Sequence, residues 1–256
     1  MRIGYFLSTE EYAPAELLEQ AAAAEDAGFH ALWISDHYHP WNDEQGNSPF
    51  VWSVIGSISQ VCSLPVTTAV TCPTVRIHPA VIAQAAATAA ELLGGRFTLG
   101  VGTGEALNEH ILGDPWPALD RRLEMLEEAV ALIRELWTGQ VVSWEGKHFT
   151  VDHARIYNRP EQHLPIFVSG FGPKATDVAA KIGDGYINTA PDPESVRRFK
   201  EGSGGKPAHA GAKVAFAPTR RRAGSTRTGS GPTPGCPASS RRCCPHPSTS
   251  SRPAPW

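Results

Sequence analysis

The stretch PVTTAVTCPTVRIHPAVIAQAAATAAELLGGRFTLGVG, residues 65–102, decides the fold. It begins with β-branched residues that are typical of a buried strand, and residues 78–95 continue as an alanine-rich helix that ends in two glycines. Residues 97–102 then return to a strand pattern. A strand, a helix and another strand in this order are typical of parallel strands joined by a right-handed crossover.

The same unit occurs twice before this stretch. Residues 2–6 and 30–36 are apolar runs that predict strands, and residues 14–29 and 49–61 predict the helices that follow them. Pro14 stands at the expected start of the first helix, where its missing N–H costs nothing. Four strand-and-helix steps therefore fall within about the first hundred residues.

The alternation of strands and helices continues after residue 102, with one interruption. Apolar residues spaced by threes and fours predict a helix over 119–137, and alternating residues predict a β-hairpin inserted near 140–165. Further strands are expected at 164–170, 183–189 and 213–218, with helices beginning at Pro173 and near Pro193. This gives seven strands in the main repeat, and the pattern contains no eighth.

Two architectures fit strands that alternate with helices. A doubly wound sheet usually has a glycine-rich turn after its first strand, and residues 7–12, LSTEEY, contain no glycine. The regular units, with polar residues after nearly every strand, instead favour a (β/α)8 TIM barrel, whose functional residues lie at the carboxyl ends of its strands. We therefore expect an α/β chain folded as a TIM barrel truncated to about seven strands.

Composition excludes several classes of function. The net charge of −3 gives no general attraction to nucleic acid or to anionic membranes, and no apolar run is long enough to cross a bilayer. Residues 2–6 already have the pattern of a buried strand, so we expect no secretory leader. These features favour a cytoplasmic protein with a small-molecule substrate and no metal.

The last 38 residues differ in composition from the rest. Residues 219–256 contain seven Arg, no Asp or Glu, and no Leu, Ile, Val, Met, Phe or Tyr. Such a segment buries too little apolar surface to fold, so we expect a barrel domain over residues 1–218 and a disordered tail over 219–256. Residues 236–240 and 244–252, written in chosen GC-rich codons and read one base out of frame, can give ordinary protein sequence, so we hypothesise a frameshift near residue 218.

Polar side chains follow several of the predicted strands and meet at one end of a barrel. Glu10 follows the first strand, Asp36 and His37 the second, Thr71 and Cys72 the third, and Glu105 and Asn108 the fourth. Each one alone is as well explained by a helix cap or a loop hydrogen bond. Their concentration at one end of the barrel favours an active site.

Five motifs in this order resemble a known family. SDHYHPW (35–41), TCPT (71–74), AVIAQAAAT (80–88), LGVGTGEALNE (99–109) and GDGYI (183–187) are similar to motifs of the luciferase-like superfamily. Within it, they most resemble the coenzyme F420-dependent oxidoreductases close to the F420-dependent glucose-6-phosphate dehydrogenases. The resemblance covers residues 2 to about 217.

The resemblance implies a role for each residue that matches a family motif. It implies that Asp36 contacts the deazaflavin ring, that His37 is the base for a substrate hydroxyl, and that Glu105 is the proton partner of the ring. Trp41 would stack at the reacting centre, with Glu10 at the same end of the barrel. The positions implied to contact the cofactor are Ala69, Val70, Cys72, Asn108, Ser169, Gly170, Phe171 and Gly172, with a cis peptide between Ala69 and Val70.

The sequence leaves more than one substrate and more than one cofactor open. The family's sugar-phosphate enzymes use a lysine shortly after the GDG strand, where this chain has Asp192, so an alcohol is preferred over glucose 6-phosphate. The alternatives are a glucose-6-phosphate dehydrogenase proper, an FMN-dependent monooxygenase of the same superfamily, and an inactive truncated remnant. A homodimer is also left open.

Overall fold

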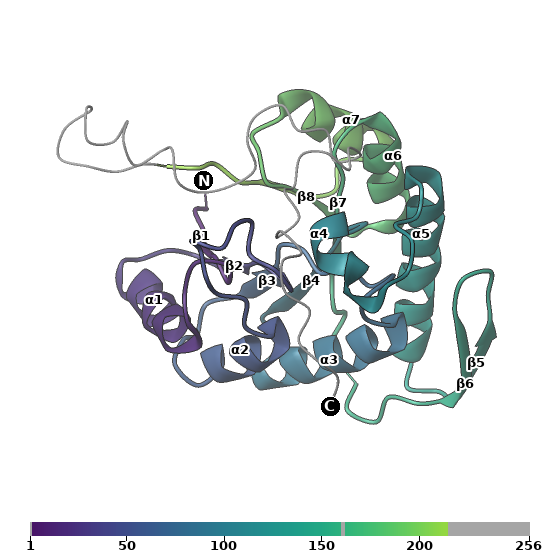
Figure 1. Cartoon of the computed structure of the whole chain (residues 1–256), viewed down its shortest axis with the longest axis horizontal. Coiled ribbons are helices and arrows are strands. Elements are labelled where there is room, and N and C mark those ends of the chain that lie inside the picture. The colour runs from purple at the N-terminus through teal and green to yellow at the C-terminus, as the bar shows by residue number, and fades with distance from the viewer. Residues whose placement is uncertain (1, 160–161, 215–256) are drawn as a thin grey trace, which may run out of the picture.

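A computed structural model describes residues 2–159 and 162–214, and its centre is a curved sheet of seven parallel strands (Figure 1). The strand order is β1–β2–β3–β4–β7–β8–β9, so strands adjacent in the main repeat are adjacent in the sheet. The strands are β1 Tyr5–Leu7, β2 Leu32–Ile34, β3 Val66–Thr68, β4 Phe97–Val101, β7 Ile166–Ser169, β8 Gly185–Asn188 and β9 Ala208–Ala210. The predicted TIM barrel of about seven strands is confirmed.

The longer helices lie on the convex side of this sheet, and the short α4 and a 3-10 turn follow β4 at the strand exits. The helices are α1 Pro14–Asp26, α2 Val51–Ile58, α3 Pro79–Leu92, α4 Ala106–Glu109, α5 Leu119–Leu136, α6 Pro173–Ile182 and α7 Pro193–Ser203, with the 3-10 turn at His110–Leu112. Four of them begin at a proline, whose fixed φ suits the first helical position. None of the described helices is long and apolar enough to cross a membrane.

The hydrophobic core lies between the strands and these helices. Alternate residues along a strand face opposite sides, so Leu32 and Ile34 of β2 are fully buried against the helices. Trp33 faces the concave side, where its ring lies 6.2 Å from that of His209 on β9. Phe167 of β7 packs against His209 from the other side, at 4.9 Å between ring centroids. The interior of the barrel is therefore packed with side chains.

A separate two-stranded sheet follows α5, as the alternation over 140–165 predicts. Its strands are β5 Val142–Glu145 and β6 Thr150–Ala154, which pair antiparallel and project beyond α5 (Figure 1). Glu128 of α5 accepts hydrogen bonds from the backbone N–H groups of His148 and Phe149, so the turn of this hairpin is fastened to the helix.

The position predicted for the seventh strand is wrong. The apolar run at 213–218 suggests the strand, but β9 lies earlier, at Ala208–Ala210, and pairs with β8 through Tyr186↔Ala208 and Asn188↔Ala210. The connection between α7 and β9 is short. Gly204 ends α7 in a left-handed conformation, and the chain pairs with β8 again after only a few residues. Lys213 and Val214 are not in a strand, and the expectations for 215–218, for the tail and for a frameshift lie outside the described residues.

Candidate active site

The side chains that follow β1 and β2 form one hydrogen-bonded group. Glu10 is 4% exposed, and its Oε2 accepts hydrogen bonds from Ser8 Oγ at 2.9 Å and Ser35 Oγ at 2.6 Å. Its other oxygen, Oε1, lies 3.3 Å from His37 Nε2. Two serine hydroxyls therefore fix the carboxylate so that one oxygen faces the imidazole.

His37 is held at both of its ring nitrogens. Nδ1 lies 3.1 Å from the carbonyl oxygen of His39, which can only accept, so the proton is on Nδ1. Nε2 therefore points at Glu10 and gains a favourable contact when it also carries a proton. The ring of Trp41 packs beside the imidazole, with 5.1 Å between the ring centroids. The predicted grouping of Glu10, His37 and Trp41 is present in the structure.

Glu105 lies close enough to this group to interact with it electrostatically. Burial raises the pKa of Glu105, the charge of His37 opposes the rise, and the nearby carboxylate of Glu10 adds to it. Its Oε2 is buried and has no hydrogen-bond partner among the described residues. A carboxyl group in such a position keeps its proton to higher pH and can donate it.

Asp36 belongs to a second cluster, which the sequence did not reveal. Its Oδ1 accepts a hydrogen bond from Arg76 Nη2 and its Oδ2 accepts one from Thr71 Oγ1, both at 2.8 Å. The backbone N–H of Arg76 donates to Glu109 Oε2 at 2.8 Å. We call Asp36, Thr71, Arg76 and Glu109 the Arg76 cluster. An arginine in a loop is usually a surface residue, so its sequence position gave no signal of this role.

Asn108 and Cys72 are buried at the same end of the barrel but form local contacts. Asn108 Oδ1 accepts hydrogen bonds from the backbone N–H groups of Tyr38 and His39, at 2.9 and 3.1 Å, and so fixes the loop that carries His37. Cys72 Sγ lies 3.1 Å from Thr74 Oγ1, and burial raises the pKa of its thiol to about 12. Both residues therefore shape the site through their neighbours.

The exits of β3 and β4 approach each other closely. The peptide between Ala69 and Val70 is cis, as the family resemblance implies. A Cβ at Gly102 would lie 2.8 Å from Val70 Cγ2, and one at Gly104 would lie 2.6 Å from Cys72 Sγ. Gly104 also has a φ of +73°, which favours glycine. These two glycines let the backbone after β4 lie against the wall of the site.

The segment after β7 leads directly into α6. Ser169 and Gly170 are buried, while Phe171 is 64% exposed and Gly172 is the N-cap of α6. A Cβ at Gly170 would lie 2.7 Å from the carbonyl carbon of Ala175, so the loop packs against the first turn of the helix. The free N–H groups of that turn are suited to an anionic group.

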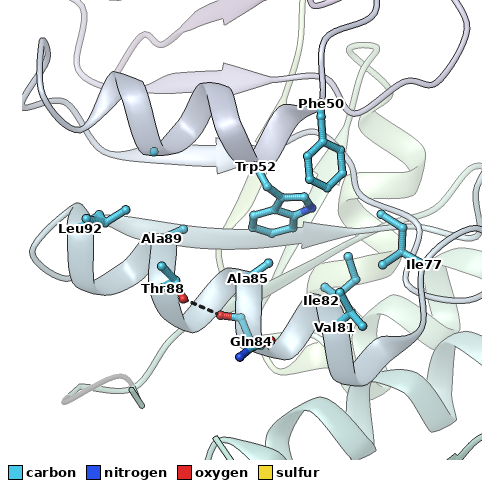
Figure 2. Close-up of a pocket in the computed structure, with 11 residues that line it drawn as sticks. Phe50, Trp52, Ile77, Val81, Ile82, Gln84, Ala85, Thr88, Ala89 and Leu92 are labelled. Carbon is cyan, nitrogen blue, oxygen red and sulfur yellow. Dashed lines mark hydrogen bonds between the residues drawn. The ribbon is translucent and has the colours of Figure 1, made fainter. Parts of the chain in front are cut away.

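A groove lies elsewhere, on the outer surface between α2 and α3 (Figure 2). It encloses about 270 Å³ and is lined mainly by apolar and small side chains, with Trp52 lying between the two helices. Phe50, Val81 and Leu92 are each about half exposed there, at 56%, 55% and 48%. Within residues 2–159 and 162–214, no group of three or more His, Cys, Asp or Glu is placed to hold a metal ion.

Comparisons with a family model and with curated proteins agree on the family of this chain. Residues 1–221 match the family described as luciferase-like monooxygenase. An F420-dependent glucose-6-phosphate dehydrogenase of Microbacterium testaceum is 44% identical over 196 residues, which cover 76% of this chain and 58% of that protein. An F420-dependent hydroxymycolic acid dehydrogenase of Mycobacterium tuberculosis is 42% identical over 191 residues, covering 74% and 53%. The chain thus spans less than two thirds of the length of these curated relatives.

Solved structures show the same likeness. An F420-dependent secondary alcohol dehydrogenase in complex with an F420-acetone adduct superimposes with a TM-score of 0.78 and is 35% identical. The superposition covers 82% of this chain and 68% of that one.

Proposed function

The chain belongs to the luciferase-like monooxygenase family, and we infer that it is a cytoplasmic, F420-dependent oxidoreductase acting on an alcohol or carbonyl group of a small molecule. The observation that carries this inference is the group Glu10, His37 and Glu105 at the carboxyl ends of the strands, in a chain similar to proteins named as F420-dependent dehydrogenases. The reaction needs a base for a hydroxyl proton and a separate acid, and this group contains candidates for both.

The residues present fit a deazaflavin cofactor. The unpartnered Oε2 of Glu105 is a buried polar atom that a bound ligand would satisfy. Gly102 and Gly104 bring backbone close to Val70 and Cys72, and this wall would be among the residues that hold the ring. The first turn of α6, after Gly172, offers N–H groups to a phosphate. When bound, F420 supplies two-electron hydride chemistry at C5 of its ring.

His37 is suited to take a proton from the substrate. Its Nδ1–H is fixed on the carbonyl of His39, so Nε2 is the nitrogen available to accept. Once Nε2 carries the proton, the imidazolium lies between two acceptors, the His39 carbonyl and Glu10 Oε1 at 3.3 Å. Glu10 therefore offers an acceptor to Nε2–H, and the serines that hold Glu10 keep it in place.

The region after β8 favours an alcohol over a sugar phosphate. Asp192 caps α7, accepting hydrogen bonds from the backbone N–H groups of Glu194 and Ser195 at 3.1 and 3.3 Å. Hydrogen bonds from Ser195 lower the pKa of Asp192, so a negative charge occupies the helix N-terminus that a phosphate would otherwise use. The preference for a substrate without phosphate follows from this charge.

Titration of the purified chain with F420 and with FMN tests the proposed function. We expect saturable quenching of F420 fluorescence and no comparable binding of FMN, followed by F420 reduction when a secondary alcohol is added. Binding of FMN alone would replace this proposal with a flavin monooxygenase. A folded chain that binds neither cofactor would instead identify an inactive remnant.

We also infer that a second copy of the chain covers the groove between α2 and α3. The two helices contain 22 residues and a single charged one, Glu91, so two copies related by a two-fold axis would meet without like-charge repulsion. The exposed Phe50, Val81 and Leu92 give each copy apolar side chains to bury, and small residues such as Gly56 and Ala85 leave space for them.

Light scattering during size-exclusion chromatography tests this interface. We expect the mass of two chains for the wild type and of one chain for Val81→Arg, which places a charge in the groove. Ala131→Arg is the matched control, because Ala131 is an exposed residue on another helix, α5. A wild-type protein with the mass of one chain, or an unchanged dimer in Val81→Arg, would contradict the proposal.

A further inference from the structure

The Arg76 cluster ties together the ends of three neighbouring strands. Asp36 follows β2, Thr71 and Arg76 follow β3, and Glu109 is in α4 after β4. The side chains of Asp36, Arg76 and Glu109 are only 1%, 7% and 2% exposed, so their charges are almost fully removed from water. A buried cation between two buried carboxylates fixes all three elements relative to each other.

The two carboxylates depend on Arg76 to different degrees. Asp36 receives a direct bond from Arg76 Nη2 at 2.8 Å, whereas Glu109 Oε1 is 3.7 Å from Arg76 Nε, an ion-pair distance without a hydrogen bond. Burial raises the pKa of Glu109, while the N–H and the charge of Arg76 oppose the rise. For Arg76, burial would lower the pKa, but Asp36 and Glu109 outweigh it. Asp36 is therefore the principal partner.

We propose that Arg76 is a positioning residue that balances the buried charges of Asp36 and Glu109 and holds the Asp36 carboxylate in the orientation that faces the deazaflavin ring, so that it controls cofactor affinity through Asp36. This rests on the proposed function, because Asp36 is the residue implied to contact the ring. Thr71 fixes Oδ2 and Arg76 fixes Oδ1, so the carboxylate has one orientation. The side chain of Arg76 is itself buried, so it acts through its contact with Asp36.

Removal of the guanidinium leaves an unstable arrangement. In Arg76→Met, Asp36 and Glu109 remain buried without a cation, and the neutral thiol of Cys72 and the hydroxyl of Thr71 are the other polar side chains that face them. Two such carboxylates cannot both stay ionised at low cost, so they bind a proton or move apart. The protonated form dominates at low pH, and the repulsion between two charges grows as the pH rises.

The ratio of F420 dissociation constants between variant and wild type, measured by fluorescence from pH 5.5 to 8.5, tests the proposal. We expect Arg76→Met to weaken binding at pH 8.5 by about 10–100-fold, as removal of the outer partners of metal ligands does. The ratio should fall towards pH 5.5. Arg76→Lys keeps the charge and should give a smaller ratio that is constant with pH. A loss of affinity in Arg76→Met that does not vary with pH would reduce Arg76 to a general structural role and overturn the proposal.

Two further measurements separate this proposal from its premise. Asp36→Asn combined with Arg76→Met should bind F420 about as weakly as Asp36→Asn alone, because Arg76 acts through Asp36. Additive losses would contradict this. Without cofactor, the free energy of unfolding of Arg76→Met in urea should fall relative to that of the wild type as the pH rises from 5.5 to 8.5. A difference between the two proteins that stays constant with pH would contradict the claim that Arg76 balances the charges of Asp36 and Glu109. Failure of the wild type to bind F420 would remove the proposed function, whereas the unfolding profile still tests the cluster.

Discussion

Two aspartate–arginine pairs lie at opposite ends of the same sheet. At the strand exits, Arg76 binds Asp36 at 2.8 Å with side chains that are 7% and 1% exposed. At the strand entries, Arg134 binds Asp184 at 2.9 Å with side chains that are 33% and 27% exposed. The chemistry of the two pairs is the same, but their surroundings differ.

The pair at the strand entries completes its hydrogen bonds within the fold. Asp184 Oδ2 accepts the backbone N–H of Ile166 at 2.9 Å, and the N–H of Asp184 donates to the carbonyl of Ile166 at 2.7 Å. The exit end instead contains Glu105, with a raised pKa and an unpartnered oxygen. In a barrel of this kind the entry end serves stability and the exit end serves function. The predictions below test that division.

His37→Ala should give the largest effect, and it should be confined to function. Loss of a general base costs about 10²–10⁴-fold in turnover. Cofactor affinity and the unfolding midpoint should change little, since the imidazole is partly exposed and contacts Glu10, the carbonyl of His39 and the ring of Trp41 at the edge of the core. His163→Ala is the matched control, because His163 lies 3.3 Å from Asp184 at the entry end and should leave turnover unchanged. Wild-type turnover in His37→Ala would exclude it as the base.

Asp184→Ala should have the reverse pattern, with a loss of stability and unchanged F420 affinity. Loss of the bonds from Ile166 and Arg134 should lower the free energy of unfolding in urea by about 2 kcal/mol. This value allows for the partial exposure of the ion pair, which weakens it. Burial pushes the pKa of Asp184 up, but these bonds outweigh it and lower the pKa. Its stabilisation is therefore complete above its ordinary value of 3.8 and is lost as the pH falls through the lower value of the folded protein. Equal acid sensitivity in the variant and the wild type would contradict this.

The order of elements could be predicted from the sequence, because each depends on local pattern. Pro14, Pro79 and Pro173 mark helix starts, and the alternation after α5 marks the hairpin. The grouping of Glu10 with His37 also followed, since parallel strands end at the same side. The place of β9 did not follow, because the length of the loop after Gly204 decides it.

The partners of buried charges could not be predicted. Arg76 lies 40 residues from Asp36 in the sequence, and no periodic pattern links them. Asn108 was expected to contact the cofactor, and its bonds to the loop at 38–39 depend on how two strand exits face each other. Such contacts arise from the curvature of the sheet, which brings distant strand exits together and which no short stretch encodes.

In the absence of cofactor, Glu105→Gln should be more stable than the wild type. This is the opposite of the loss of stability expected for Asp184→Ala at the other end of the sheet. Burial raises the pKa of Glu105, so its ionised form is disfavoured in the folded state. The wild type therefore loses stability as the pH rises from 4.5 through the raised value, and the glutamine variant does not. We expect the difference in unfolding free energy to grow to about 1 kcal/mol by pH 8, the lower cost of an unpaired buried polar group. Glu145→Gln, at an exposed position, is the control, and a difference that is constant with pH would contradict the burial of Glu105.

The smallest expected effect concerns two cysteines at the two ends of β3. Cys62 precedes the strand and Cys72 follows it, and they are 6% and 4% exposed. Burial raises the pKa of both thiols, that of Cys72 to about 12, so both remain protonated and unreactive at pH 8. Peptide mapping after brief treatment of the native protein with iodoacetamide should show little labelling at either residue and least at Cys72, with full labelling in urea. Rapid native labelling of Cys72 would mean that the wall formed with Gly104 opens to solvent, and the exit end would then be less rigid than its hydrogen bonds indicate.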